Sequence, residues 1–164
     1  MDQKIAVLGA GSIGSSFAAD LTDAGLDVTI IDQWPAHVEV MKENGLEITM
    51  PDLHLHVRVN AWHLCELAEH VPQFDIIFLA VKSYDTAWLS RLIEPYLKTD
   101  GVFIGLQNGM NNETISDIIG TGRTIGCAVE LSAEIFTPGI VKRDTTRSGT
   151  WFGIGELDGA LTPR

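Results

Sequence analysis

Three glycines, Gly9, Gly11 and Gly14, stand between an apolar run and a helix-like segment, and they constrain the fold more than any other feature. The six residues from Gly9 to Gly14 fit G-x-G-x-x-G, follow the strand-like run Ile5–Leu8 and open the helix-like run Ser12–Ala24. In that context the first glycine makes a tight turn, the second lets a pyrophosphate approach, and the third lets the helix pack on the sheet. The free amides and the dipole at the helix start then hold the phosphates. The sequence therefore predicts a dinucleotide site, rather than an empty glycine-rich turn, at Gly9, Ala10, Gly11, Ser12, Ile13 and Gly14.

An acidic residue ends the next strand-like run. Asp32 lies 21 positions beyond Gly11, and an acidic residue about 20 positions after the glycine motif accepts hydrogen bonds from the adenosine ribose. Its carboxylate would repel a 2′-phosphate, and the residues that follow, Gln33-Trp34-Pro35, include no arginine. We therefore expect NAD as the cofactor, with NADP disfavoured. The other interpretation is that Asp32 caps a helix beginning at Pro35.

Apolar runs alternate with helix-like segments along the chain. The runs are continuous, as parallel strands covered on both faces require: Ile5–Leu8, Val28–Ile31, Asp75–Val81 and Val102–Leu106. The helix-like segments are Ser12–Ala24, Pro35–Glu43, Tyr84–Leu97 and Asn111–Ile119. This alternation predicts an α/β fold, a Rossmann-type doubly wound and mainly parallel sheet in a single domain over residues 1–164.

Two regions depart from this alternation. His54–Asn60 alternates polar and apolar residues, which is typical of an edge strand with one solvent-facing side. Gly139–Thr145 and Thr150–Glu156 predict a C-terminal β-hairpin extension. Thr162 and Pro163 have the pattern of a helix start, so we expect the protein to continue beyond Arg164.

Charge and composition exclude several classes of partner. The chain has 22 acidic and 11 basic side chains, a net charge of −11, whereas nucleic acids and anionic membranes are bound by Lys and Arg. The longest apolar run, Ile76–Val81, is far shorter than the ~20 residues of a membrane span. The first strand starts almost at Met1 without a signal peptide, and Cys65 and Cys127 have the spacing of reduced, buried thiols rather than of a metal site. We expect a cytoplasmic protein with no nucleic-acid or membrane partner.

Two more strand ends carry polar side chains. Lys82 follows the run Asp75–Val81, and Asn108 follows Val102–Leu106. Ligands of doubly wound sheets bind outside the carboxyl ends of the strands. Lys82 is therefore a candidate for cofactor or substrate oxygens, and Asn108 for nicotinamide, ribose or substrate. The alternatives are a solvated lysine and an ordinary Asn-Gly turn.

Taken together, the glycine motif, Ala80-Val-Lys-Ser-Tyr-Asp-Thr86 and Leu106-Gln-Asn-Gly-Met110 resemble the N-terminal domain of ketopantoate reductases (2-dehydropantoate 2-reductases). The resemblance extends from residue 4 to the end, and the last two segments are its more specific part. It implies a two-domain oxidoreductase of pantothenate biosynthesis that reduces a 2-oxo acid to a 2-hydroxy acid with a nicotinamide cofactor. It also implies that Lys82 and Asn108 face both cofactor and substrate, and that Ala133 lies beside the nicotinamide.

Two departures limit the resemblance. NADPH-dependent members carry a basic or small polar residue where Asp32-Gln33 stand here, so ketopantoate itself stays open as the substrate. The family's catalytic lysine lies in an all-helical second domain, expected beyond residue 164, through which a homodimer would form. We therefore assign no catalytic residue and expect the 164-residue chain alone to be inactive. A non-catalytic NAD-sensing module and another NAD-dependent hydroxyacid dehydrogenase are the alternative hypotheses.

Several other side chains carry no functional assignment. His54 and His56 share a strand face without a third ligand, so we assign no metal site. His37 has no evident partner, and Trp34 either packs or covers the adenine. Asp20, Asp23 and Asp27 fit a solvated helix end rather than a cation site.

Overall fold

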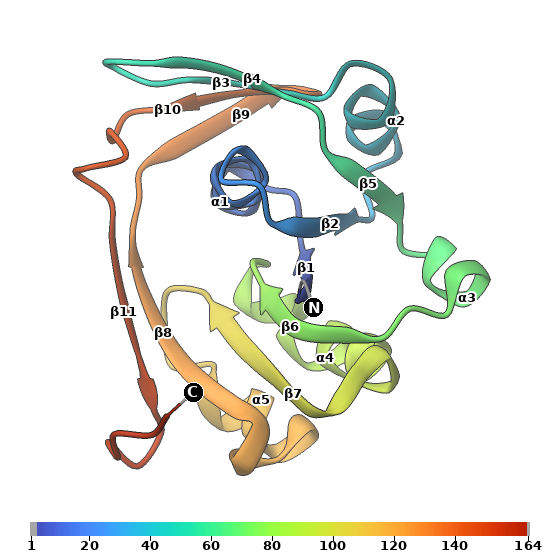
Figure 1. The fold of residues 1–164 in the computed structure, drawn as a ribbon, viewed down its shortest axis with the longest axis vertical. Helices are drawn as coiled ribbons and strands as arrows, with labels where there is room; N and C mark the ends of the chain where they lie inside the picture. The colour runs from blue at the N-terminus through green and yellow to red at the C-terminus, as the bar shows by residue number, and fades with distance from the viewer. Residues whose placement is uncertain (1–2, 164) are drawn as a thin grey trace.

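Six parallel strands and one antiparallel strand form the central sheet of the computed structural model, which describes residues 3–163 (Figure 1). The strands are β1 (Lys4–Leu8), β2 (Asp27–Asp32), β5 (Asn60–His63), β6 (Phe74–Leu79), β7 (Leu97–Leu106), β8 (Thr124–Glu130) and β11 (Trp151–Glu156). They lie in the order β11-β8-β7-β6-β1-β2-β5, and β11 is the antiparallel one. Without β11, this is the strand order of a doubly wound dinucleotide-binding sheet, with the reversal between β1 and β6. The predicted Rossmann-type fold is confirmed.

Both faces of the central sheet are buried, which explains its continuous apolar strands. In β1, Ile5 and Val7 belong to the core on one face, whereas Ala6 and Leu8 belong to the core on the other. The first face carries α1 (Ser12–Asp23) and α2 (Pro35–Asn44), and the second carries α3 (Glu66–His70), α4 (Thr86–Ile93) and α5 (Asn112–Ile119).

Three short 3-10 turns lie next to α4 and β8. They are η1 (Ser83–Asp85) and η2 (Glu94–Tyr96) on either side of α4, and η3 (Thr121–Arg123) before β8. The helix predicted over Tyr84–Leu97 is therefore shorter than expected, with a 3-10 turn at each end of α4, and β7 already begins at Leu97. None of the helices within residues 3–163 has both the length and the apolar character needed to cross a membrane.

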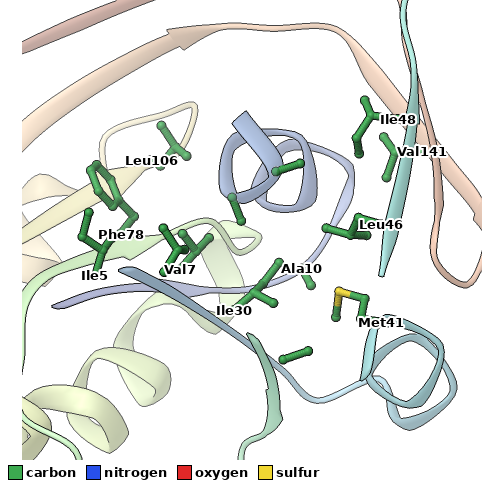
Figure 2. Close-up of a cluster of buried hydrophobic side chains, with 14 of the residues drawn as sticks. Ile5, Val7, Ala10, Ile30, Met41, Leu46, Ile48, Phe78, Leu106 and Val141 are labelled. Carbon is green, nitrogen blue, oxygen red and sulfur yellow. The ribbon is translucent and has the colours of Figure 1, made fainter. Parts of the chain in front are cut away.

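A second, four-stranded sheet covers α1 from outside and was not predicted as a sheet. It contains β3 (Leu46–Thr49), β4 (His54–Val57), β9 (Ala133–Thr137) and β10 (Ile140–Arg143), in the order β4-β3-β10-β9. The edge strand expected at His54–Asn60 is present as β4, at the edge of this sheet. α1 lies between the two sheets (Figure 1), surrounded by apolar side chains from both, such as Val7 of β1 and Ile48 of β3 (Figure 2).

The C-terminal hairpin differs from the predicted pairing. Gly139–Thr145 and Thr150–Glu156 do form strands, β10 and β11, but these do not pair with each other. They are successive parts of one arm of a bent antiparallel ribbon, whose other arm is β8 followed by β9. The reversal is at Pro138-Gly139, where Gly139 has φ +78°. The residues between β10 and β11 bend the ribbon from one sheet to the other (Figure 1).

Ion pairs join the end of α1 to this ribbon. Arg143 of β10 is buried and donates to an Asp20 carboxylate oxygen at 2.5 Å and to the Thr150 hydroxyl at 2.5 Å. Arg147 donates to Asp20 at 2.7 Å and to Asp23 at 2.8 Å. The expectation of a solvated helix end at Asp20 and Asp23 is therefore wrong, because two arginines more than 120 positions later in the chain neutralise it.

Candidate functional site

The glycine turn between β1 and α1 has backbone positions that a side chain would block. Gly9 has φ +103°, and a Cβ there would lie 2.7 Å from the Ala80 carbonyl oxygen. A Cβ on Gly14 would lie 1.9 Å from the Gly9 carbonyl oxygen. In contrast, a Cβ on Gly11 would meet no atom within 4 Å. Gly9 and Gly14 are therefore required by the fold, whereas Gly11 leaves open space over the turn.

The start of α1 is free to bind an anion. Gly11 is the N-cap residue, and no side chain makes a capping hydrogen bond to it. The first-turn amides of a helix have no partner within the helix. Ser12 and Ile13 therefore present backbone N–H groups beside the space that Gly11 leaves, an arrangement suited to phosphate groups.

Asp32, at the end of β2, is bonded to the glycine turn itself. One carboxylate oxygen accepts the Ala10 N–H at 2.5 Å, and the other accepts the Trp34 N–H at 2.7 Å. The N-cap residue of α2 is Trp34, so the helix-cap interpretation of Asp32 is wrong. A carboxylate has about four acceptor sites, so Asp32 retains capacity for hydroxyl donors.

The ends of five parallel strands, β1, β2, β6, β7 and β8, contribute to one cavity of about 310 Å³, the strand-end pocket. Its lining comprises Gly9, Gly11, Ile13, Asp32, Gln33, Ala80, Val81, Lys82, Ser83, Tyr84, Asp85, Leu106, Gln107, Asn108 and Val129. Lys82 and Asn108 both line this pocket and are exposed. They lie at the same edge of the sheet because they follow the neighbouring parallel strands β6 and β7. The structure thus brings most of the candidate residues together. Ala133 is not in this lining: it opposes Arg143 at the start of β9 in the second sheet.

A buried amide joins the two loops that carry Lys82 and Asn108. Gln107 donates from its side-chain nitrogen to the Val81 carbonyl at 2.7 Å and to the Thr86 hydroxyl at 2.9 Å. These interactions fix the spacing between the end of β6 and the end of β7. The sequence pattern alone does not indicate a role for Gln107, although Gln107 and Thr86 lie in the segments that resemble the ketopantoate reductases.

His37 of α2 is completely buried and has two partners, so the expectation that it has none is wrong. Its Nδ1 accepts the Gly139 N–H at 2.8 Å, and its Nε2 lies 3.2 Å from the Ser15 hydroxyl oxygen. The indole ring of Trp34 stacks on it with ring centroids 5.2 Å apart. Burial lowers the pKa of His37, and the nearby Asp32 carboxylate opposes part of that effect.

The remaining histidines and the cysteines form no further site. No group of three or more His, Cys, Asp or Glu within residues 3–163 is arranged to hold a metal ion. His54 and His56 are exposed on β4 and bond separately, to Glu47 and to the Asn44 carbonyl. Both cysteines are free thiols, but Cys65 is exposed, so the expected burial holds for Cys127 alone.

Comparisons with known proteins identify the family of the chain. A family model described as ketopantoate reductase PanE/ApbA matches residues 5–156. The chain is 36% identical over 162 residues to the 2-dehydropantoate 2-reductase of Pyrococcus abyssi, covering 98% of this chain and 48% of that protein. The 2-dehydropantoate 2-reductase of Geobacter metallireducens has the same fold, with a TM-score of 0.86 at 24% identity over 97% of this chain and 51% of that one.

A solved structure of D-mandelate dehydrogenase with NADH and anilino(oxo)acetate is equally similar. Its TM-score is 0.85 at 26% identity, over 94% of this chain and 48% of that chain. The present chain thus spans about half the length of the proteins it matches.

Proposed function

The chain belongs to the ketopantoate reductase PanE/ApbA family, and we propose that it is the cofactor-binding half of an oxidoreductase that reduces a 2-oxo acid to a 2-hydroxy acid. The observation that carries this proposal is the strand-end pocket, where the glycine turn, Asp32, Lys82 and Asn108 meet. This pocket lies at the reversal of strand order, where doubly wound sheets bind dinucleotides.

The residues present fit a nicotinamide dinucleotide. The open space at Gly11 and the uncapped start of α1 suit the pyrophosphate. Asp32 suits ribose hydroxyls, because it still has acceptor capacity after binding Ala10 and Trp34. Its negative charge opposes a 2′-phosphate, so we propose NAD(H) rather than NADP(H). When bound, the nicotinamide supplies the hydride.

Lys82 and Asn108 suit the substrate end of the pocket. Lys82 is the one Lys or Arg among the described residues that line it, and its ammonium can pair with the carboxylate of a 2-oxo acid. The Asn108 amide can both donate and accept, so it can bind the carbonyl of the substrate or the cofactor. We assign these two residues to binding and orientation, not to proton transfer.

We further propose that an all-helical second domain completes the enzyme. As the family resemblance implies, this domain supplies the lysine that donates the proton, contributes to a homodimer and is absent from residues 1–164. The present chain should therefore bind cofactor without turning over substrate. The cytoplasmic location stays a prediction from the sequence.

A second candidate is an NAD-dependent dehydrogenase for a 2-hydroxy acid other than pantoate. Asp32 favours it, and so does the similarity to a D-mandelate dehydrogenase solved with NADH. Assaying the full-length protein with ketopantoate and with an aryl 2-oxo acid would separate the two candidates. The NAD-sensing alternative is not favoured, because the named relatives are reductases and dehydrogenases.

The test of the cofactor site is a titration of NADH and NADPH, followed by NADH fluorescence, against wild type and Asp32→Arg. We expect wild type to prefer NADH by at least about tenfold, or ~1.4 kcal/mol, and Asp32→Arg to prefer NADPH. Asp27→Arg is the matched control, since Asp27 is exposed at the opposite end of the same strand. An unchanged preference in Asp32→Arg would remove Asp32 from the site.

A further inference from the structure

Two successive peptide groups of the glycine turn are held from opposite sides. The Ala10 N–H donates to Asp32 at 2.5 Å, and the Ala10 carbonyl accepts from the Ser15 hydroxyl at 2.8 Å. Ala10 lies between Gly9 and Gly11, so these bonds set how the turn faces the strand-end pocket. Asp32 was identified from the sequence, but the Ser15 contact was not.

Ser15 is in turn oriented by His37, and the bond directions form a consistent chain. The Gly139 amide can only donate, so Nδ1 of His37 accepts and the ring carries its proton on Nε2. Nε2–H then donates to the Ser15 oxygen across 3.2 Å, which leaves the Ser15 proton for the Ala10 carbonyl. This series of hydrogen bonds connects the β9–β10 turn of the second sheet to the glycine turn.

We propose that His37 is a positioning residue for the dinucleotide, acting through Ser15 on the Ala10 carbonyl. This inference rests on the proposed function. It assigns part of cofactor affinity to a buried side chain that does not line the strand-end pocket. It also gives the second sheet a role, because Gly139 of that sheet determines which ring nitrogen carries the proton.

This series of hydrogen bonds, from Gly139 through His37 and Ser15 to Ala10, requires a neutral His37 ring. A protonated ring would turn an N–H toward the Gly139 N–H, and two donors would face each other. Around the ring, Ser15, Trp34 and Gly139 carry no charge, whereas the Asp32 carboxylate and the Ala10 backbone both raise the pKa of His37 and oppose part of the effect of burial. Since burial lowers the pKa of His37 from 6.5, the neutral form is present above that value. Cofactor affinity should therefore be constant above about pH 6.5 and fall only at a lower pH, where the lowered pKa of His37 is crossed.

Two conservative variants separate the two bonds of the ring. Asn at position 37 can keep an acceptor near Nδ1 but cannot reach Ser15, whereas Gln can keep a donor near Nε2. With NADH and the 164-residue chain, we expect His37→Asn and Ser15→Ala each to weaken binding about tenfold, the effect of one lost positioning bond. We expect the double variant to be no weaker than either single variant, and His37→Gln to bind within about twofold of wild type.

The pH series uses NAD⁺ and calorimetry, from about pH 7.5 down to the lowest pH at which circular dichroism shows the protein to be folded. Wild type should lose affinity at a pH below 6.5 within this series, whereas His37→Gln should not show this loss. The control is His54→Asn, an exposed histidine on β4, which should behave as wild type. Circular dichroism shows whether each variant is folded, and Ser15→Ala decides the question if His37→Asn is not.

Unchanged NADH binding in folded His37→Asn or in Ser15→Ala would overturn the inference, and so would additive effects in the double variant. If wild type binds NADH and these variants do too, only the role of His37 is wrong. If wild type binds neither NADH nor NADPH, the proposed function is wrong and the inference fails with it.

Discussion

Alanine substitutions at Gly14 and at Gly11 should have different effects: the first should lower stability, and the second should weaken cofactor binding. A methyl group on Gly14 would lie 1.9 Å from the Gly9 carbonyl oxygen, so the turn and α1 would have to move apart by more than 1 Å to reach ordinary contact. α1 cannot yield easily because it is packed between two sheets. Overpacking of this kind lowers the free energy of unfolding by about 3 kcal/mol or more. This is a large share of the ~5–15 kcal/mol by which a typical domain is stable.

A methyl group on Gly11 meets no protein atom within 4 Å. Gly11→Ala should therefore change the free energy of unfolding by less than about 1 kcal/mol, the usual effect at an N-cap. The same methyl occupies the space proposed for the pyrophosphate, so NADH affinity should fall at least about tenfold.

Both variants are measured in the same two assays. Urea unfolding, followed by tryptophan fluorescence, should show a midpoint lowered by about 1.5 M in Gly14→Ala, given a slope of about 2 kcal/mol/M, and little change in Gly11→Ala. NADH titration then compares Gly11→Ala with wild type. The reasoning is refuted if Gly11→Ala binds NADH as wild type does, or if both variants unfold at the same urea concentration.

Two other features give testable predictions. Asp20→Asn should lower the free energy of unfolding by about 3 kcal/mol, because it leaves the buried Arg143 guanidinium without its counter-charge; Asp23→Asn, in an exposed pair, should cost less than about 1 kcal/mol in the same urea titration. Cys65 should react quickly with a chromogenic disulfide reagent at neutral pH, whereas Cys127 should react only on unfolding, because burial raises the pKa of the Cys127 thiol and keeps it protonated. Rapid labelling of both thiols in the folded protein would contradict this expectation.

Local patterns predicted the parallel strands β1, β2, β6 and β7 of the central sheet, but not β5 and β8. Runs such as Ile5–Leu8 are apolar on both faces because helices cover both, and the glycine turn follows from strand, motif and helix in sequence. The second sheet could not be predicted in the same way. Its central pair joins β3 to β10, and local periodicity carries no information on pairing between segments so distant in the chain. The same limit explains the wrong hairpin: both of its segments form strands, but their partners lie in β8 and β9.

Site prediction depended on fixed spacing. Asp32 could be identified because its distance from Gly11 is set by one helix and one strand. Lys82 and Asn108 could be placed because parallel strands end at the same edge of the sheet. His37 could not be identified, since its partners, Ser15 and Gly139, are 22 and 102 positions away. The second of these partners lies in the β9–β10 turn, which local sequence does not place beside α2.

Pairing of β3 with β10 also has a consequence for the order of assembly. The glycine turn and α1 are encoded in the first 23 residues, but the strand that completes the layer above them ends at Arg143. On the ribosome, this helix leaves the exit tunnel with one side uncovered, and contacts between such distant segments form late because closing a long loop is entropically costly. The second sheet therefore cannot cover α1 until nearly the whole of this chain has been translated.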